Sequence, residues 1–397
     1  MAIRDACIPV RLGWSSPFVR WQGALAELSS IDLAVDVTSR ALSERDLPVS
    51  ELSSLVFGWT VPQREIFYGT PTLAHRLGAG HTTGPMVSQA CATSAVAIEL
   101  AAMRVDAGLD DLTLVVTTDR TSNGPVITYP SPSAPGGAPA TEHWVLDSFK
   151  RDPVGGKAMV GTADGVAAEA GMTRGQLDEV TLQRYEQYET ALADDRAFQR
   201  GYMVPVHLPR RRAEPTIVDE DEGIFPSTAE GLAKLAPVDP DGVVTYGSQT
   251  HPADGTAGVV VTSHDRAREL SEGRGVARIL GTGTARVGLA QMPKAPVPAA
   301  QAALDAAGLG FDDVDVMTTH NPFAVNDVWL HQQTGFPLER MNLHGSSLIF
   351  GHPQGPTGAR LIVELMHTLA ERGGGVGLFT GCAAGDSGAA IVLRVED

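Results

Sequence analysis

Three residues with reactive side chains lie in stretches of glycine and small residues. Cys91 follows "VSQA" and precedes "ATSAVAIELAAM", a long run of mostly small and apolar residues. His352 lies between a glycine and a proline in "FGHPQGPTGAR", and Cys382 lies in "FTGCAAGDSG". A histidine in such a turn can take the proton of a thiol, which leaves a strong nucleophile. The pattern therefore predicts nucleophilic chemistry with a cysteine and an imidazole base.

The place of Cys91 at the predicted start of a helix adds to this expectation. The first amides of a helix are unpaired and carry partial positive charge, so we expect the Cys91 thiolate to be stabilised near neutral pH. Two alternatives remain open. Most free cysteines are inert small core residues, and thiols with histidines can bind zinc. No CxxC or HxxxH spacing occurs, so we expect no metal.

The composition narrows the class of protein. A chain of 397 residues suggests two or three structural units. It carries 30 Lys and Arg against 47 Asp and Glu, and a net charge of -17 argues against nucleic acid or an anionic membrane as a partner. Three widely spaced cysteines favour a reducing compartment. With no signal-peptide pattern and no apolar run of about 18 residues, we expect a cytoplasmic protein.

Strand and helix patterns alternate along most of the chain. Residues 24–48 have helical apolar spacing, and residues 52–62 and 112–118 are typical of buried strands. Residues 122–144 are dense in Pro, Gly and Ser, and residues 173–201 form a polar amphipathic pattern. Strand and helix patterns resume near residue 254 and continue to the end. The chain is therefore predicted to be an α/β protein with a more exposed insertion.

Several motifs, taken in order, resemble those of the thiolase family, the acetyl-CoA acetyltransferases and 3-ketoacyl-CoA thiolases. "CATSA" at 91–95 is similar to its nucleophile turn, and "GHPQGPTGAR" at 351–360 is similar to its GHPxGxSGAR segment. "GCAAGDSGAA" resembles its CxGGGxG-type loop. "HNPF" at 320–323 stands where the family commonly has N-E-A-F, closer to the histidine variants of sterol-carrier-type thiolases. The resemblance extends over nearly the whole chain.

The resemblance implies an α/β fold of a particular kind. Thiolases consist of two similar βαβαβαββ halves packed into a five-layered α/β/α/β/α core, and a loop domain inserted in the first half covers the substrate. Carried onto this chain, the first half is residues 1–119, completed by 252–276. The loop domain is residues 120–251, and the second half is residues 277–397.

The resemblance also implies an activity, that of an acyl-CoA C-acyltransferase that makes or cleaves 3-ketoacyl-CoA by Claisen chemistry. By position, Cys91 attacks the acyl thioester and His352 takes its proton. Cys382 is the acid and base at the substrate's α carbon, and His320 helps His352 bind the thioester or enolate oxygen. Backbone amides at Cys91 and near Ala384 form one oxyanion hole. Such a division of labour suits a condensation, because an enolate oxygen must be neutralised beside the new bond.

Coenzyme A and acyl-CoA are implied as substrates, with no permanently bound cofactor. Thr250 matches a family serine that contacts the pantetheine arm, and the resemblance places Met159 and Phe323 in the same binding site. A homodimer or a dimer of dimers is also implied, although "QREIFYGTPTLAHR" replaces the family's usual dimer-side segment.

Two other classes of protein share these features in part. A 3-oxoacyl synthase or a hydroxymethylglutaryl-CoA synthase would lack the second cysteine or replace it with histidine or glutamate. A sterol-carrier-like lyase that works with a small partner protein should have lost the nucleophile. The presence of both Cys91 and Cys382 favours a thiolase over these alternatives.

Overall fold

The computed structural model describes residues 1–122, 124–210 and 212–396. Their main feature is an 11-stranded sheet with the order β13-β14-β15-β12-β1-β11-β6-β4-β5, in which β2 and β3 also pair with β11. The strands are β1 (Ala6–Pro9), β2 (Gly13–Ser15), β3 (Val19–Arg20), β4 (Ser54–Gly58), β5 (Met86–Val87), β6 (Leu112–Arg120), β11 (Ala253–Ser263), β12 (Val276–Arg286), β13 (Val316–His320), β14 (Gly375–Ala383) and β15 (Ser387–Glu396).

The sheet repeats one pattern of pairing in its two halves. In the first half β4 is parallel to β6, β6 is antiparallel to β11, and β11 is antiparallel to β1. In the second half β13 is parallel to β14, β14 is antiparallel to β15, and β15 is antiparallel to β12. The halves join where β1 and β12 pair in antiparallel fashion. The structure thus displays an internal duplication that the sequence does not.

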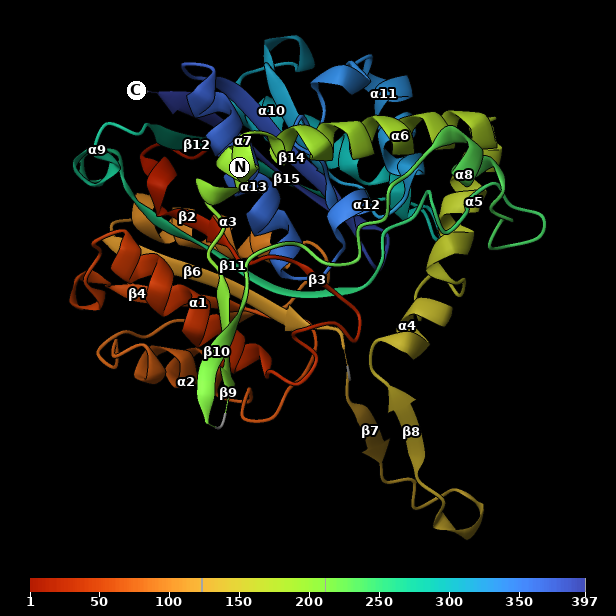
Figure 1. The fold of residues 1–397 in the computed structure, drawn as a ribbon, viewed down its shortest axis with the longest axis horizontal. Helices are drawn as coiled ribbons and strands as arrows, with labels where there is room; N and C mark the ends of the chain where they lie inside the picture. The colour runs from red at the N-terminus through yellow and green to blue at the C-terminus, as the bar shows by residue number, and fades with distance from the viewer. Residues whose placement is uncertain (123, 211, 397) are drawn as a thin grey trace.

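Helices cover the sheet in three layers. They are α1 (Ser30–Glu44), α2 (Gly69–Arg76), α3 (Thr93–Asp106), α9 (His264–Ser271), α10 (Pro296–Ala307), α11 (Ala324–Thr334), α12 (Ser347–Phe350) and α13 (Pro356–Glu371). Helix α1 packs on β6 and β11 of the first half, and α10 packs on β12 and β15 of the second. Between the halves, α3 and α13 contact each other (Figure 1). The expected α/β/α/β/α layering is confirmed.

The two middle helices approach each other closely. A Cβ at Gly358 on α13 would lie 3.2 Å from the Cβ of Ser94 on α3, so a larger side chain there would push the helices apart. Because α13 contacts β11 on one side and β13 and β14 on the other, it is buried nearly all round. The residues before α3 and α13 carry Cys91 and His352, so the close approach of these helices brings the two catalytic candidates together.

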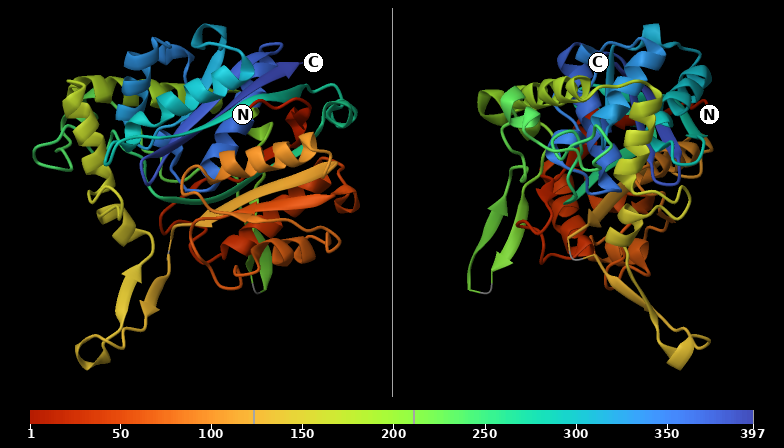
Figure 2. Two further views of the ribbon diagram at one scale, coloured as in Figure 1. Left: turned by 180° about the vertical axis from the view of Figure 1, so that it is seen from behind. Right: turned by 90° about the vertical axis from the view of Figure 1, so that its right-hand side faces the viewer.

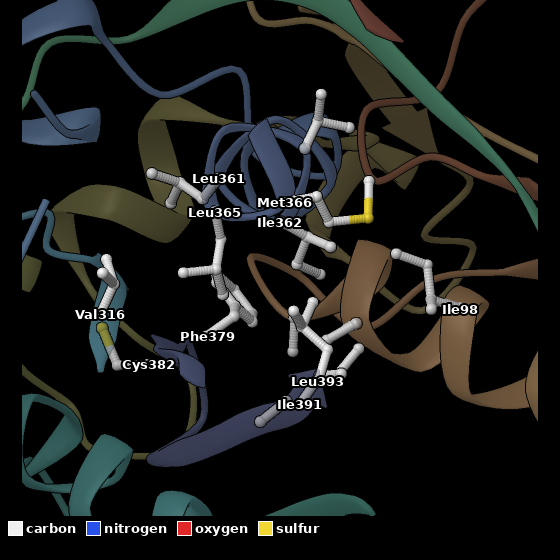
Figure 3. Packing of buried hydrophobic residues seen from close by; sticks show 14 of the residues in the cluster. Ile98, Val316, Leu361, Ile362, Leu365, Met366, Phe379, Cys382, Ile391 and Leu393 are labelled. Atoms are coloured by element: carbon white, nitrogen blue, oxygen red, sulfur yellow. The ribbon is translucent and has the colours of Figure 1, made fainter. Parts of the chain in front are cut away.

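The side chains of α13 form part of the largest core cluster. Figure 3 shows Leu361, Ile362 and Leu365 of α13 beside Phe379 of β14, with Cys382 at the edge of the cluster. The cluster fixes α13 against the strand that carries the second cysteine. Among the described residues, no helix combines the length and the apolar character that crossing a membrane requires.

The segment between β6 and β11 forms the insertion. It contains β7 (Val126–Tyr129), β8 (Ala140–His143), α4 (Leu146–Lys150), α5 (Met159–Glu169), α6 (Arg174–Ala191), α7 (Ala193–Arg200), β9 (Val206–Arg210), β10 (Ala213–Val218) and α8 (Ala229–Ala233). The β7–β8 hairpin projects away from the body of the molecule (Figures 1 and 2). The insertion is exposed, as expected, but the single helix predicted over residues 173–201 is divided into α6 and α7, with positive φ values from Asp194 to Arg196. Helix α6 begins with a capping box between Thr173 and Gln176.

Buried ion pairs fasten the insertion to α13. Both terminal nitrogens of Arg360 donate to Asp221 of the insertion, at 2.6 and 2.7 Å, and its Nε donates to Glu364 at 3.0 Å. The guanidinium lies over the ring of Phe350, with its carbon 3.8 Å from the ring centroid. Arg360, Asp221 and Glu364, hereafter the Arg360 network, hold the insertion over the end of the sheet where the candidate site lies.

Candidate active site

Cys91 lies in a tight turn two residues before α3. The amide of Gln89 donates to Thr93 Oγ at 2.9 Å, and that hydroxyl donates to the Ala90 carbonyl at 2.7 Å. Ala90 has φ of 45°, a left-handed conformation that costs free energy for a residue with a Cβ. The strained turn directs the Cys91 sulfur into a cavity rather than into the core. The predicted helix start is correct to within two residues.

His352 is in direct contact with the thiol. Its Nε2 lies 3.1 Å from Cys91 Sγ, and its Nδ1 lies 2.6 Å from Thr357 Oγ. If Nε2 is to accept the thiol proton, the ring hydrogen must be on Nδ1, where Thr357 Oγ can accept it. Burial and the neighbouring His320 lower the pKa of His352 well below its ordinary value. The imidazole is therefore a neutral base across the physiological pH range.

The expectation of a stabilised thiolate at Cys91 is wrong. Burial raises the pKa of the Cys91 thiol to about 11, and the backbone amides of Ala384 and Cys91, which donate to the sulfur, only partly offset that effect. Loss of hydration outweighs the unpaired amides at the helix start. The resting pair is thus a thiol and a neutral imidazole, and the proton must move as the sulfur attacks.

His320 is the last residue of β13 and lies against His352. The two ring centroids are 4.1 Å apart with an interplanar angle of 32°. His320 Nδ1 lies 2.9 Å from Ser347 Oγ, whereas its buried Nε2 has no hydrogen-bond partner among the described residues. Burial lowers the pKa of His320 to about 3. A neutral ring with one unused nitrogen therefore stands beside the base.

Cys382 lies one residue before the end of β14 and is buried. Its sulfur accepts a hydrogen bond of 3.3 Å from Asn326 Nδ2. Burial, and to a smaller degree the neighbouring Cys91, raises the pKa of Cys382. Its neighbour Gly381 pairs with His320 between the parallel strands β14 and β13, so the structure brings Cys382 to the same site as the histidines.

A central cavity of about 260 Å³ opens at this cluster. Cys91 and His352 line it, and so do Thr250, Met159 and Phe323, the three residues predicted to bind coenzyme A. The Thr250 hydroxyl donates to the Ser347 carbonyl, which leaves its oxygen free to accept a hydrogen bond from a ligand. His320 and Cys382 are not among the lining residues and lie behind them.

The same cluster contains a possible set of metal ligands. Cys91 Sγ and one ring nitrogen from each of His320 and His352 all lie within 4.8 Å of one another. Zinc accepts thiolate and imidazole ligands, so these residue types fit it, but they equally fit proton transfer. The absence of a metal therefore stays a prediction.

Gln354 contacts the nucleophile, a role that sequence reasoning missed. The Cys91 thiol donates to Gln354 Oε1 at 3.4 Å, and the backbone of Gln354 is left-handed, with φ of 67°. Gln354 and Thr357 both lie in the "GHPQGPTGAR" motif, two and five residues after His352. The motif located them, but only the folded turn shows which atoms they contact.

Asp119, at the end of β6, is a second residue that sequence reasoning missed. Its carboxylate accepts hydrogen bonds of 2.8 Å from the amides of Thr60, Val61 and Gly355. Burial raises the pKa of Asp119 to about 7 although these amides lower it. The contact with Gly355 fixes the turn that carries His352. The sequence feature that could have identified Asp119 is its place, as a charged residue, directly after the predicted buried strand 112–118.

Comparisons with known proteins agree on one family. The profile of the "Thiolase, N-terminal domain" matches residues 13–265, and that of the "Thiolase, C-terminal domain" matches residues 274–395. An acetyl-CoA acetyltransferase of Escherichia coli is 31% identical, over 94% of this chain and 95% of the relative. A β-ketoadipyl-CoA thiolase of Acinetobacter baylyi is 29% identical, over 96% and 97%. The crystal structure of the Bacillus anthracis acetyl-CoA acetyltransferase superposes with a TM-score of 0.91 at 26% identity and covers 99% of both chains.

Proposed function

The chain belongs to the thiolase family, and we propose that it makes or cleaves 3-ketoacyl-CoA through an acyl-enzyme on Cys91. It is an acyltransferase. The observation that carries the proposal is the contact of 3.1 Å between Cys91 Sγ and His352 Nε2 at the wall of a cavity, with the amides of Cys91 and Ala384 donating to the sulfur. A nucleophile, its base and oxyanion donors are thus in one place.

In the first half-reaction, Cys91 Sγ attacks the carbonyl carbon of an acyl-CoA. Its proton passes to His352 Nε2, and the amides of Cys91 and Ala384 stabilise the developing oxyanion. When the tetrahedral intermediate collapses, the bond to the CoA sulfur breaks and the imidazolium returns the proton to that sulfur. The products are acyl-Cys91 and free CoA.

In the second half-reaction, Cys382 acts at the α carbon of a second acyl-CoA. Once ionised, its thiolate removes an α proton, and the enolate oxygen accepts a hydrogen bond from His320 Nε2. That nitrogen can carry the hydrogen if Ser347 Oγ donates to Nδ1, at 2.9 Å. The enolate carbon then attacks the acyl group, the bond to Cys91 Sγ breaks, and the departing Cys91 thiolate takes up the proton that Cys382 released on ionising, which restores the Cys91 thiol. Cleavage by free CoA is the reverse of these steps.

His320 gives this site the histidine form of the family's N-E-A-F motif, which the resemblance assigns to sterol-carrier-type thiolases. Nε2 of His320 is buried and has no hydrogen-bond partner among the described residues, which supports a role in binding an oxygen of the substrate, because leaving a buried polar atom unpaired costs free energy. The neutral state of the ring suits a donor that must not exchange protons with the substrate.

Coenzyme A is the carrier of both acyl groups, and none of these steps needs a permanently bound cofactor. Met159 and Phe323 offer apolar contacts to the pantetheine arm, and the Thr250 oxygen accepts a hydrogen bond from one of its amides. All three line the central cavity with the nucleophile. The three cysteines are free thiols, which suits a cytoplasmic enzyme with a thiol nucleophile.

A homodimer would cover an exposed apolar region near the nucleophile. Phe67 and Tyr68 are 79% and 68% exposed, and Met86 belongs to β5, the edge strand of the sheet. An uncovered edge strand beside exposed aromatic rings favours pairing with a second copy. Light scattering on the purified protein should give twice the chain mass or a higher multiple.

The decisive assay is thiolysis of a panel of 3-ketoacyl-CoA substrates with free CoA. The wild-type protein should produce two acyl-CoA molecules from each 3-ketoacyl-CoA consumed, and Cys91→Ala should abolish turnover while it keeps the circular dichroism spectrum. If Cys91→Ala retains turnover, or if the wild type cleaves no member of the panel, the proposed function is wrong.

A further inference from the structure

A second cavity adjoins the central cavity at the nucleophile. This distal cavity measures about 330 Å³, and Phe149, Met159, Gln354 and Ala384 line both spaces. Gln354 accepts the hydrogen bond of the Cys91 thiol, and the Ala384 amide donates to the Cys91 sulfur. An acyl group on that sulfur therefore stands at the junction of the two cavities.

The two cavities lead away from this junction past different residues. The central cavity includes Thr250 and Tyr246, on the side assigned to the pantetheine arm. The distal cavity includes Ser88 and Ala90, directly before the nucleophile, together with Trp144. Because CoA and the rest of the acyl chain are attached to opposite sides of the reacting carbonyl, the distal cavity is free to receive the acyl chain.

Side-chain contacts hold the wall of the distal cavity in a fixed position. The Trp144 indole N–H donates to the Thr60 carbonyl at 2.8 Å, which fixes the ring as one side of the cavity. Val61, Val145 and Phe149 add further apolar surface. Pockets that bind small molecules are mostly apolar, with a few placed polar groups, and this composition fits a hydrocarbon chain.

The charges of the distal cavity exclude an anionic ligand. Neither lysine nor arginine occurs among its lining residues, which all belong to the described part of the chain. Its acidic residue, Asp152, accepts hydrogen bonds from the amides of Val154 at 2.6 Å and Gly155 at 3.1 Å, and from Gly385 at 3.4 Å. A carboxylate on the acyl chain would lose its hydration here and meet a like charge.

We propose that the distal cavity binds the acyl chain of an uncharged, apolar 3-ketoacyl-CoA that is longer than acetoacetyl-CoA. This inference rests on the proposed function, because it takes the acyl group to be attached to Cys91. It goes beyond that function by assigning the substrate class from the shape and charge of a second cavity.

Steady-state thiolysis with four substrates tests the proposal. The value of kcat/KM for 3-oxooctanoyl-CoA should exceed that for acetoacetyl-CoA by about tenfold or more, since each buried methylene contributes to discrimination. Of two substrates with six-carbon acyl groups, 3-oxohexanoyl-CoA should exceed 3-oxoadipyl-CoA, which carries a terminal carboxylate, by about tenfold or more.

A substitution that fills the distal cavity distinguishes the loss of this cavity from a general loss of activity. Ser148, on α4, lines the distal cavity and not the central one. Ser148→Phe should lower kcat/KM for 3-oxooctanoyl-CoA about 10- to 100-fold relative to acetoacetyl-CoA. Ser43→Phe makes the same change at an exposed position of α1 and should leave the preference for chain length unchanged.

The failure of this inference can be told apart from the failure of the proposed function. Turnover of acetoacetyl-CoA in preference to every longer substrate would overturn the inference alone. An equal loss on all substrates in Ser148→Phe would also overturn it, because that result is expected if a second copy of the chain fills the distal cavity. No turnover of any substrate would overturn the proposed function itself.

Discussion

Two buried polar clusters, one around His352 and one around Arg360, differ in whether their polar atoms have hydrogen-bond partners. In the Arg360 network a charged guanidinium has its carboxylate partners, and the side chains of Arg360 and Asp221 are both 0% exposed. In the proposed catalytic cluster, Cys91, His320 and His352 are neutral, and one imidazole nitrogen has no partner among the described residues. Arg360 lies eight positions after His352 along the chain.

The two clusters show how the segment around α13 can stabilise the fold and also position reactive groups. Tyr202 adds a hydrogen bond of 2.5 Å to Glu364, so the Arg360 network is rigid and closed to ligands. The catalytic cluster keeps its thiol undissociated and one nitrogen unused until substrate arrives. Rigid contacts on α13 hold the loop that carries the reactive groups.

The largest effect is expected on the catalytic side, from Cys382→Ser. Removing the proposed acid and base should lower thiolysis by about 10²- to 10⁴-fold, the usual range for general acid–base catalysis. Acylation of Cys91 by acetyl-CoA, followed by mass spectrometry, should survive, because that step does not use Cys382. Equal losses of both activities would show that the two cysteines do not have separate roles.

In the Arg360 network, Asp221→Asn should lower the stability of the fold rather than the rate of the reaction. It leaves the buried Arg360 charge without its counter-ion, and breaking a buried pair in this way costs about 3–5 kcal/mol of unfolding free energy. Denaturant unfolding measures the change. Asp219→Asn is the matched control, because Asp219 pairs with Arg196 at the surface, where such pairs contribute about 0–1 kcal/mol. Similar losses of unfolding free energy in the two variants would contradict a larger contribution of the buried pair to stability.

The sequence predicted much of the fold and many of the site residues, but few of their contacts. Helical spacing and strand runs located α1, β4, β6 and α6, because each has a local pattern that packing preserves. The motifs located Cys91, His320, His352 and Cys382. The pairing of Arg360 with Asp221, 139 residues away, has no local signal. The pKa of Cys91 was expected in the wrong direction, because burial depends on elements that no single motif describes.

His320→Ala tests whether the unused nitrogen acts on the substrate. Loss of one oxyanion donor should lower kcat by about 10²- to 10³-fold, or about 3–4 kcal/mol, with little change in stability. His320→Asn should recover part of the rate, because it restores the family's usual donor. A near-normal kcat together with a lower Tm in His320→Ala would assign the ring a structural role instead.

The smallest effect is a dependence of stability on pH. His320 has a folded-state pKa of about 3 and an ordinary value of 6.5, so the unfolded chain takes up a proton first. The stability that the neutral ring contributes is present above pH 6.5 and is lost as the pH falls toward 3, by at most about 1.4 kcal/mol per pH unit. Between pH 7 and pH 4, the wild type should lose more stability than His320→Asn. If stability falls with pH equally in the wild type and in His320→Asn, His320 is not a buried, neutral residue.

The central claim is that Cys91 carries the acyl group, and the site of acylation tests it most directly. The protein is incubated with acetyl-CoA, quenched in acid and digested, and the peptides are examined by mass spectrometry. We expect one acetyl group, on the peptide that contains Cys91, and its loss when free CoA is added. Acetylation of Cys7 or Cys382 in its place, or no acetylated peptide at all, would contradict it.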